Sequence, residues 1–277
     1  MSAAGVVRQR IFQGEVELDA LPRGDRGHAY GDGLFETMRA HDGDVPWWDA
    51  HWTRLARDAA RLFLPLPPSM LVRGHARDLL AGGAGVLRLQ VTRGPGARGY
   101  APDPDAEPVW TLSAHPTPPV QAPLVLRWCS TRLAVQPALA GMKHCNRLEQ
   151  VLARAEWRDP AVVADEGLML DTAGNVICAT SANLFVHVDG AWRTPPVDRC
   201  GVRGICRDFA MPALDAKELR LSMDDVERAD SLFLCNAVRG ILEVARLGER
   251  VWSPDPRIAR LRGRLAAAHP AFALEFP

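Results

Sequence analysis

Only two of the 33 lysine and arginine residues are lysines, Lys143 and Lys217. Lys143 lies in residues 141–150, between an expected strand and an expected helix. A lysine partly removed from water has a lowered pKa, so its free amine can attack a carbonyl or accept a proton. A lysine at a junction between elements is also commonly a solvated loop residue. Position alone leaves both interpretations open, a reactive amine and a surface charge.

Residues 94–99 read G-P-G-A-R-G and satisfy the G-x-G-x-x-G pattern of dinucleotide-binding loops. That fingerprint requires a helix to begin at the glycines, so that its N-terminus meets a pyrophosphate. The following Y-A-P-D-P run cannot begin such a helix, because proline interrupts helical hydrogen bonding. The segment instead predicts a surface hairpin loop, in which Arg93 and Arg98 near Tyr100 also suit carboxylate recognition.

The elements that must position these residues mix strands and helices. Apolar and alternating runs predict strands at 6–12, 34–40, 86–92, 109–114, 124–129, 167–171, 176–188, 191–194 and 231–236. Helical spacing predicts helices at 48–64, 69–80, 147–157, 204–214 and 256–268, with Ser69 as an N-cap. Ser222 and Asp225 form a capping-box pattern. Because no regular strand–helix–strand alternation is present, the sequence predicts an α+β fold.

Residues 115–123 contain four prolines and little that could pack, which predicts a linker. We therefore expect a smaller N-terminal α+β domain at 1–114 and a larger C-terminal α/β domain at 124–277 that carries Lys143. The length of 277 residues is sufficient for two modest domains.

Composition excludes several classes of function. Basic and acidic residues balance at 33 each, so no net field favours nucleic acid or an anionic membrane. The six cysteines form no C-x-x-C pair, and no metal site is predicted. The chain starts without a signal-peptide pattern, and its apolar runs fall short of the about 20 residues of a membrane span. We expect a cytoplasmic protein with reduced cysteines.

The segment G-M-K-H-C-N-R-L-E-Q at 141–150 resembles the cofactor-lysine motif of the fold type IV pyridoxal-phosphate enzymes, and most closely that of the aminodeoxychorismate lyases. The resemblance covers residues 24–244 through separate motifs in the same order. They are Y-G-D-G-L-F-E-T at 30–37, A-H-W-T-R-L at 50–55, R-G-P-G-A-R-G-Y at 93–100, S-A-N-L-F at 181–185, G-V-R-G-I at 201–205 and C-N-A at 235–237. It implies an α+β, two-domain architecture like that of the D-amino-acid and branched-chain aminotransferases.

The resemblance implies pyridoxal 5'-phosphate as the cofactor, held as a Schiff base on Lys143, which also moves the proton. Arg54 and the backbone donors of a helix start would bind the cofactor phosphate, and a strand end would add donors for phosphate or substrate. The helix start is Gly204, Ile205 and Cys206, and the strand end is Asn236 and Ala237. The alternative interpretations are a solvent-facing arginine and ordinary turns. The candidates for substrate binding are Arg98, Tyr100, Asn236, Arg26 and Arg147.

Thr37 indicates the type of reaction. After the F-E pair, branched-chain aminotransferases of this fold carry glycine, D-amino-acid aminotransferases carry valine, and the lyases carry threonine. In the lyases this threonine is proposed to protonate the departing enolpyruvate, which requires orientation and coupled proton transfer because a hydroxyl is a poor acid. A purely structural threonine is the alternative. The resemblance implies a homodimeric lyase of folate biosynthesis that converts 4-amino-4-deoxychorismate to 4-aminobenzoate and pyruvate.

Cys178 departs from the family pattern. Most relatives carry a glutamate there, which pairs with the pyridine nitrogen of the cofactor, and a thiol with an ordinary pKa near ~8.5 cannot replace its charge. Three interpretations compete: aromatisation of the product drives the reaction without a strong electron sink, another acid reaches the nitrogen, or the cofactor is held poorly and activity is lost. We favour the first interpretation.

Two rival functions follow from the same motifs. One is a D-amino-acid or branched-chain aminotransferase, against which Thr37, Cys178 and the K-H-x-N-R-L-E-Q run all argue. The other is a non-catalytic homologue that retains the fold without its cofactor.

Overall fold

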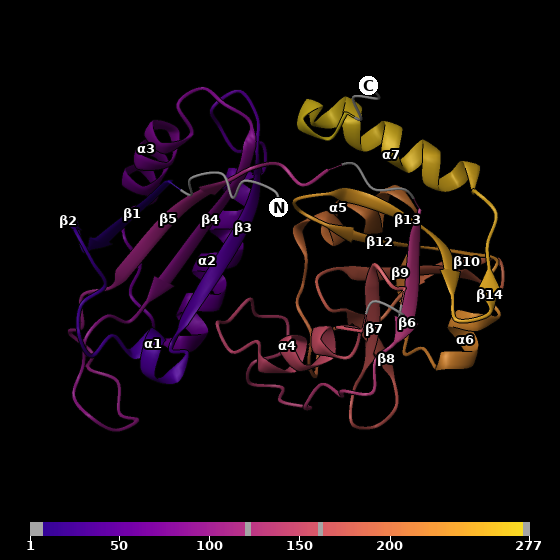
Figure 1. Cartoon of the computed structure of the whole chain (residues 1–277), viewed down its shortest axis with the longest axis horizontal. Helices are drawn as coiled ribbons and strands as arrows, with labels where there is room; N and C mark the ends of the chain where they lie inside the picture. Colours follow the sequence, from indigo (N-terminus) through magenta and orange to yellow (C-terminus); the bar gives the residue numbers. More distant parts are fainter. Residues whose placement is uncertain (1–7, 120–122, 160–162, 274–277) are drawn as a thin grey trace. The chain divides into compact units, whose positions relative to one another are not determined.

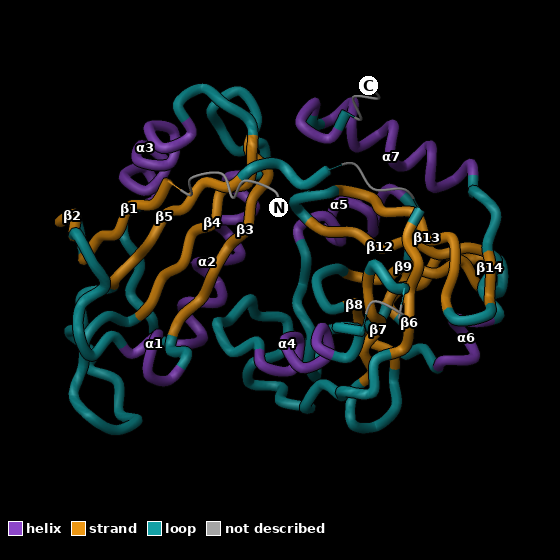
Figure 2. Tube along the Cα trace, viewed as in Figure 1, coloured by secondary structure: helices purple, strands orange, loops and turns teal. Residues whose placement is uncertain are grey.

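The computed structural model describes residues 8–119, 123–159 and 163–273. The chain divides into two compact units (Figures 1 and 2). Unit 1 comprises Met1–Pro118 with Lys143–Asn146, and unit 2 comprises Pro119–Met142 with Arg147–Pro277. The division after Pro118 lies inside the expected linker at 115–123, of which residues 120–122 fall outside the described part of the chain, as do residues 6 and 7 of the first expected strand.

Unit 1 is built on a five-stranded antiparallel sheet with the order β2-β1-β5-β4-β3 (Figure 1). Its strands are β1 (Arg8–Gln13), β2 (Val16–Leu18), β3 (Gly33–Ala40), β4 (Gly85–Thr92) and β5 (Val109–His115). Its helices are α1 (Arg26–Tyr30), α2 (Trp48–Leu62) and α3 (Ser69–Leu80).

The two faces of this sheet differ because side chains alternate along each strand. One face is buried against α2 and α3, and its core includes Leu34 and Met38 of β3 and Leu87 and Leu89 of β4. The other face carries the intervening residues, which are mostly polar and half-buried. Since β3 is the edge strand, its outer side is open to pairing with another segment.

Unit 2 contains a nine-stranded mixed sheet with the order β11-β10-β9-β12-β13-β6-β7-β8, and β14 pairs with β13. The strands are β6 (Leu124–Trp128), β7 (Glu166–Leu170), β8 (Val176–Ala179), β9 (Asn183–Val188), β10 (Ala191–Thr194), β11 (Lys217–Glu218), β12 (Ser231–Asn236), β13 (Gly240–Leu247) and β14 (Arg250–Val251). The helices are α4 (Leu148–Ala155), α5 (Ile205–Ala213), α6 (Met223–Glu227), α7 (Pro256–Ala268) and the 3-10 turn η1 (Pro270–Phe272). Among the described strands, only β6–β7, β6–β13 and β10–β11 pair in parallel, so the α+β prediction is confirmed.

Several local predictions are confirmed and others are wrong. Ser222 forms the predicted capping box with Asp225, while Ser69 is the first residue of α3, preceded by Pro68 as the N-cap. The strand expected at 176–188 is two strands, β8 and β9, separated at residues 180–182. No helix begins at the glycines of residues 94–99, in agreement with the rejected dinucleotide site. No helix in the described part of the chain combines the length and apolar character needed to span a bilayer.

Candidate active site

Lys143 lies beside the edge strand of unit 1. The N–H of Phe35 donates to the Lys143 carbonyl at 3.0 Å, and the N–H of Cys145 donates to the Gly33 carbonyl at 2.9 Å. These bonds flank an antiparallel bridge between Leu34 and His144. Residues 143–145 therefore extend the sheet beyond β3, which is why Lys143 groups with unit 1 and not with the C-terminal domain that we predicted.

Two further contacts fix this segment. The Lys143 N–H donates to Oδ2 of the buried Asp58 at 3.1 Å. Asn146 packs against Gly31, where an added Cβ would lie 2.1 Å from the Asn146 Oδ1. Gly31 also has a φ of 68°, as the C-cap of α1. Both the left-handed backbone and the close approach therefore require glycine at this position of the Y-G-D-G motif.

The pairing determines which side chains share a face with Lys143. Residues directly opposite one another in a sheet point to the same face. Lys143 is opposite Phe35, and its Nζ lies 4.3 Å from the centre of the Phe35 ring. Thr37 is the next residue of β3 on this face and is opposite Arg88 of β4. The structure thus brings the two predicted catalytic residues, Lys143 and Thr37, to the same half-buried face.

Arg54 belongs to a buried cluster of charges on the opposite face. Its Nε donates to Oε1 of Glu36 at 2.8 Å, and its Nη2 donates to Oε2 of the same carboxylate. The Nδ1 of His51 lies 2.6 Å from Glu36 Oε2. Burial alone would raise the pKa of Glu36, but the charge of Arg54 and the hydrogen bonds outweigh it and lower the pKa to about 2. Arg54 is therefore not solvent-facing: Glu36 holds its guanidinium in one orientation.

Arg26, one of the predicted substrate-binding residues, is engaged within unit 1. Arg26 is buried, and its Nε donates to Asp32 at 3.0 Å while Nη1 and Nη2 donate to the carbonyls of Gly99 and Tyr100 at 2.8 and 3.2 Å. Arg93 binds the same Asp32 through its Nε at 2.8 Å and its Nη2 at 3.0 Å. Because these bonds occupy the Arg26 guanidinium, its role is to hold the loop after β4 in place.

That loop carries Arg98 and Tyr100, both of which are exposed. The Tyr100 ring meets Tyr30 edge-on at 5.6 Å. No contact of either residue with the face of Lys143 is seen among the described residues. Arg147 lies in unit 2, where its Nη2 donates to the Met142 carbonyl at 3.0 Å and ties together the two ends of the 143–146 segment.

The predicted phosphate donors meet within unit 2. Gly204 is the N-cap of α5 and offers no side-chain cap, so the first N–H groups of the helix, including those of Ile205 and Cys206, have no acceptor within it. The Cys206 thiol is buried and hydrogen-bonds to Cys235 at the end of β12, which places the start of α5 beside Asn236 and Ala237. The Oδ1 of Asn236 accepts from the N–H groups of Val238 and Arg239 at 3.0 and 2.8 Å, which shapes the turn after β12.

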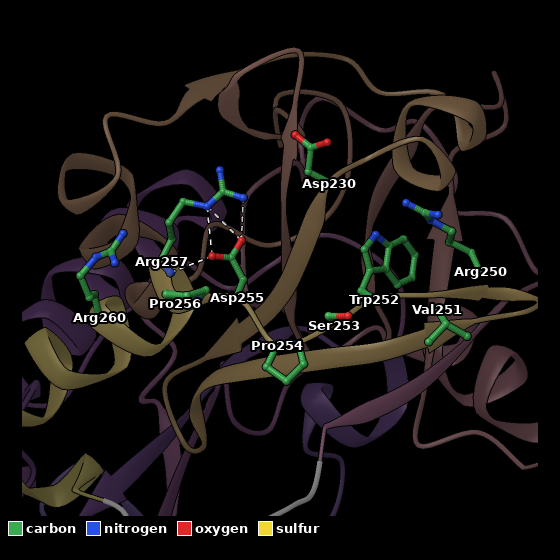
Figure 3. A pocket seen from close by; sticks show the side chains of 10 residues that line it. All are labelled: Asp230, Arg250, Val251, Trp252, Ser253, Pro254, Asp255, Pro256, Arg257 and Arg260. Atoms are coloured by element: carbon green, nitrogen blue, oxygen red, sulfur yellow. Dashed lines mark hydrogen bonds and ion pairs between the residues drawn. The ribbon is translucent and has the colours of Figure 1, made fainter.

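A separate hollow of about 620 Å³ lies on unit 2 near the start of α7, lined by residues that include Trp252, Arg250 and Arg260 (Figure 3). Its Arg257 is already paired with Asp255 at 2.7 Å. None of the predicted site residues lines this hollow, so it is not the predicted active site.

Comparison with known proteins identifies the family. The profile of the family described as "Amino-transferase class IV" matches residues 33–247. The chain belongs to this family. An aminodeoxychorismate lyase of Vibrio harveyi is 34% identical over 260 residues, which is 88% of this chain and 94% of the relative.

Solved structures agree with this membership. The 4-amino-4-deoxychorismate lyase of Pseudomonas aeruginosa superposes with a TM-score of 0.84 and 39% identity, over 93% of this chain and 98% of the other. The branched-chain aminotransferase of Thermoproteus uzoniensis, solved with norvaline, superposes with a TM-score of 0.79 over 94% of each chain. Its 18% identity shows a shared fold only.

Two features of this chain suit pyridoxal phosphate, the cofactor of these class IV enzymes. Lys143 supplies a half-buried amine, and the uncapped start of α5 supplies N–H groups and a helix dipole suited to a phosphate dianion. Gly204 is required there, since an added Cβ would lie 2.1 Å from Oδ1 of Asn183, whose Nδ2 donates to the Val202 carbonyl at 2.9 Å.

Cys178 does not fit as a partner for the pyridine nitrogen in the way that a carboxylate would. It packs in an apolar cluster with neighbours such as Met169, Ile177 and Cys200. Burial, reinforced by Cys200, raises the pKa of the Cys178 thiol to about 12, so it carries no charge at neutral pH. The carboxylate of Glu166 also raises this pKa, but it already accepts hydrogen bonds from the hydroxyls of Thr180 and Ser181.

Sequence reasoning did not identify Phe35, Asp58 or Arg88 as neighbours of the lysine and threonine. Phe35 and Arg88 are brought beside Lys143 and Thr37 by register, because residues 143–145 pair with β3 and β3 pairs with β4. Asp58 reaches the Lys143 N–H from helix α2. A period-two reading of β3 would have placed Phe35, Thr37 and Arg39 on one face, but not the segment that pairs with it.

Proposed function

We propose that the chain is a pyridoxal-phosphate-dependent lyase that converts 4-amino-4-deoxychorismate to 4-aminobenzoate and pyruvate. The observation that carries this proposal is the shared face of Lys143 and Thr37, which offers a base and a hydroxyl to one bound molecule. The lyase relatives from Vibrio harveyi and Pseudomonas aeruginosa, at 34% and 39% identity, support the same reaction.

Pyridoxal phosphate, when bound, supplies a carbonyl that combines with the amino group of the substrate and a ring that draws electrons from the adjacent carbon. Lys143 holds the cofactor between turnovers, and its amine then removes the proton from the carbon that bears the nitrogen. The backbone donors of Ile205 and Cys206, with Asn236 and Ala237, bind the phosphate. Arg54, oriented by Glu36, adds a charge-assisted contact.

In this proposal the Thr37 hydroxyl donates a proton to the departing enolpyruvate, which leaves as pyruvate while the ring becomes aromatic. Breakage of the ether C–O bond and loss of the ring proton together produce 4-aminobenzoate, so no oxidant or water is consumed. Aromatisation supplies a driving force that transamination lacks. This accounts for a lyase that works with the neutral Cys178 in place of a carboxylate.

The first test is spectroscopic. We expect the purified protein to show a visible absorption band that shifts on treatment with borohydride, and the Lys143→Ala variant to lack the shift. Absence of a band in the wild-type protein supplied with pyridoxal phosphate would indicate a non-catalytic homologue.

The second test separates the lyase from an aminotransferase. The protein is incubated either with 4-amino-4-deoxychorismate or with an amino donor and 2-oxoglutarate. We expect 4-aminobenzoate and pyruvate in equal amounts from the first mixture, and little glutamate from the second. Rapid glutamate formation without 4-aminobenzoate would overturn the lyase assignment.

The proposal includes a homodimer in the cytoplasm. The support for association is a stripe on α4, where Leu148, Val151 and Leu152 occur at helical spacing and are 76%, 58% and 59% exposed. A second copy of the chain would cover this stripe. The cytoplasmic assignment is supported by the six cysteines, all of which are free thiols.

A further inference from the structure

The half-buried face that carries Lys143 and Thr37 is rich in cations. Across the sheet, Lys143 lies opposite Phe35 of β3, and Phe35 lies opposite Gln90 of β4. Thr37 of β3 lies opposite Arg88 of β4 in the next such row. Arg39 follows Thr37 on the same face, opposite Val86. None of these seven residues is an aspartate or glutamate, so the face presents three basic side chains and no carboxylate.

Arg88 extends toward the row of the lysine. Its guanidinium carbon lies 4.3 Å from the centre of the Phe35 ring, the same distance as the Lys143 Nζ. Its Nη2 donates to Oε1 of Gln90 at 3.3 Å. Burial lowers the pKa of Arg88, because the charged guanidinium is partly removed from water at this position.

The guanidinium of Arg39 is also partly removed from water. Its Nε is buried and has no hydrogen-bond partner among the described residues, and burial also lowers its pKa. Within residues 8–119, 123–159 and 163–273, neither Arg39 nor Arg88 forms an ion pair, whereas the buried Arg26, Arg54 and Arg93 all bind a carboxylate. Partly buried charges without a counter-ion are costly, so an anionic ligand on this face would relieve both.

We infer that Arg88 and Arg39 form a two-point clamp for the two carboxylates of the substrate, with Thr37 between them. This inference rests on the proposed function, whose substrate is a dicarboxylate. In an antiparallel sheet, diagonal neighbours such as these lie roughly 7–8 Å apart at their backbones, a separation that long side chains can span. Arg88 lies opposite Thr37 and takes the carboxylate of the enolpyruvyl group that Thr37 protonates. Arg39 takes the carboxylate of the ring.

The two products separate the two carboxylates, because pyruvate retains one and 4-aminobenzoate the other. The test is calorimetric titration of each product into the wild-type holoenzyme and into the Arg88→Gln, Arg39→Gln and Arg10→Gln variants. Arg10 is the matched control, since it is an arginine of the same sheet that is already paired with Glu17 at 2.7 Å. Thermal melting is recorded for every variant, so that a loss of folding is not mistaken for a loss of binding.

We expect Arg88→Gln to weaken pyruvate about 10- to 100-fold and Arg39→Gln to weaken 4-aminobenzoate by a similar factor, because hydrogen bonds to charged groups are lost. Arg88→Lys should recover part of the affinity, since the charge returns without the planar fork. Unchanged affinities in folded variants, equal losses for both products, or an exchanged pattern would each overturn the inference. These titrations need no turnover, so a failure of the lyase assay and a failure of the clamp remain distinguishable.

Discussion

Thr37 follows Phe35 on the half-buried face of β3, and Phe35 lies opposite Lys143. The proposed function assigns the Thr37 hydroxyl the role of general acid. We predict that Thr37→Val lowers kcat for release of 4-aminobenzoate by about 100-fold or more, because general acid catalysis contributes roughly 10²–10⁴-fold. Thr37→Ser should retain most of the activity. The measurement is the steady-state rate, with the visible cofactor band as the control for an intact site. Full activity in Thr37→Val would leave the residue with a structural role only.

Cys178 is a buried, uncharged residue at the position where most relatives carry a glutamate. Its neutral thiol, with a pKa raised to about 12 by burial, cannot stabilise a protonated pyridine nitrogen. We predict that Cys178→Glu keeps lyase activity or raises the transaminase side activity. The new carboxylate should also lower the melting temperature, since it enters an apolar cluster beside Met169.

Both assays and a melting curve on the purified Cys178→Glu protein check this expectation, and Cys178→Ser is the uncharged control. If the wild-type protein were inactive and only Cys178→Glu gained activity, the natural chain would be a degenerate relative.

At the level of single residues, the sequence motifs indicated Lys143 and Thr37 as candidates, and the structure places both on one face. The sequence around Arg26, in contrast, did not indicate that its guanidinium binds Asp32 and two carbonyls of a loop more than 70 residues away. Arg88 and Arg39 were missed for the related reason that their importance lies in lacking such a partner. Whether a charge is paired depends on tertiary contacts, which a single sequence does not specify.

Helix α2 and strand β3 are joined by the buried cluster of Glu36, His51 and Arg54. We predict that Glu36→Gln lowers the free energy of unfolding by about 3–5 kcal/mol, because the Arg54 charge stays buried without a counter-charge. Urea unfolding followed by tryptophan fluorescence measures this change. Glu17→Gln is the control, since it removes an exposed ion pair with Arg10 and should cost at most about 1 kcal/mol. Equal effects of the two substitutions would contradict a structural role for the cluster.

The same cluster predicts a dependence of stability on pH. The folded-state pKa of Glu36 is lowered from 4.5 to about 2, so the ionised form is the one that the fold stabilises. Its contribution is complete above pH 4.5 and is lost as the pH falls toward 2. The difference in unfolding free energy between wild type and Glu36→Gln should therefore shrink as the pH is lowered from about 5 to about 2. A constant difference across this range would show that the carboxylate charge does not matter.

Elements with strong periodicity were predicted closely, as α3 and α7 show with bounds at 69–80 and 256–268. The five-residue α1 was missed, because it depends on the Asp25 cap and Gly31 and not on an apolar pattern. Strand β13 was also missed, although its buried Ile241, Val244 and Leu247 left a signal. The pairing of residues 143–145 with β3 could not be predicted, since register between segments more than 100 residues apart is set by the assembled sheet.

Each unit carries its own group of proposed functional residues. Unit 1 holds the lysine, the hydroxyl and the basic face, and unit 2 holds the uncapped start of α5. The segment Lys143–Asn146 belongs to unit 1, whereas the residues before and after it belong to unit 2. A hydrogen bond from Arg147 to the Met142 carbonyl joins the two residues that flank this segment. Lys143 is thereby fixed to the sheet that carries the proposed substrate face.

Helix α4 exposes an apolar stripe formed by Leu148, Val151 and Leu152. Three large apolar side chains on one helical face would be costly in water, so we expect a second copy of the chain to cover them. A charge at the centre of such an interface would be buried without a partner. Leu152→Asp should therefore convert the dimer to a monomer in sedimentation velocity at micromolar concentration. Val251→Asp is the matched control, because Val251 is 62% exposed at the edge strand β14 of the same unit, away from this helix in sequence. A wild-type protein that sediments as a monomer, or a Leu152→Asp variant that stays dimeric, would remove α4 from the interface.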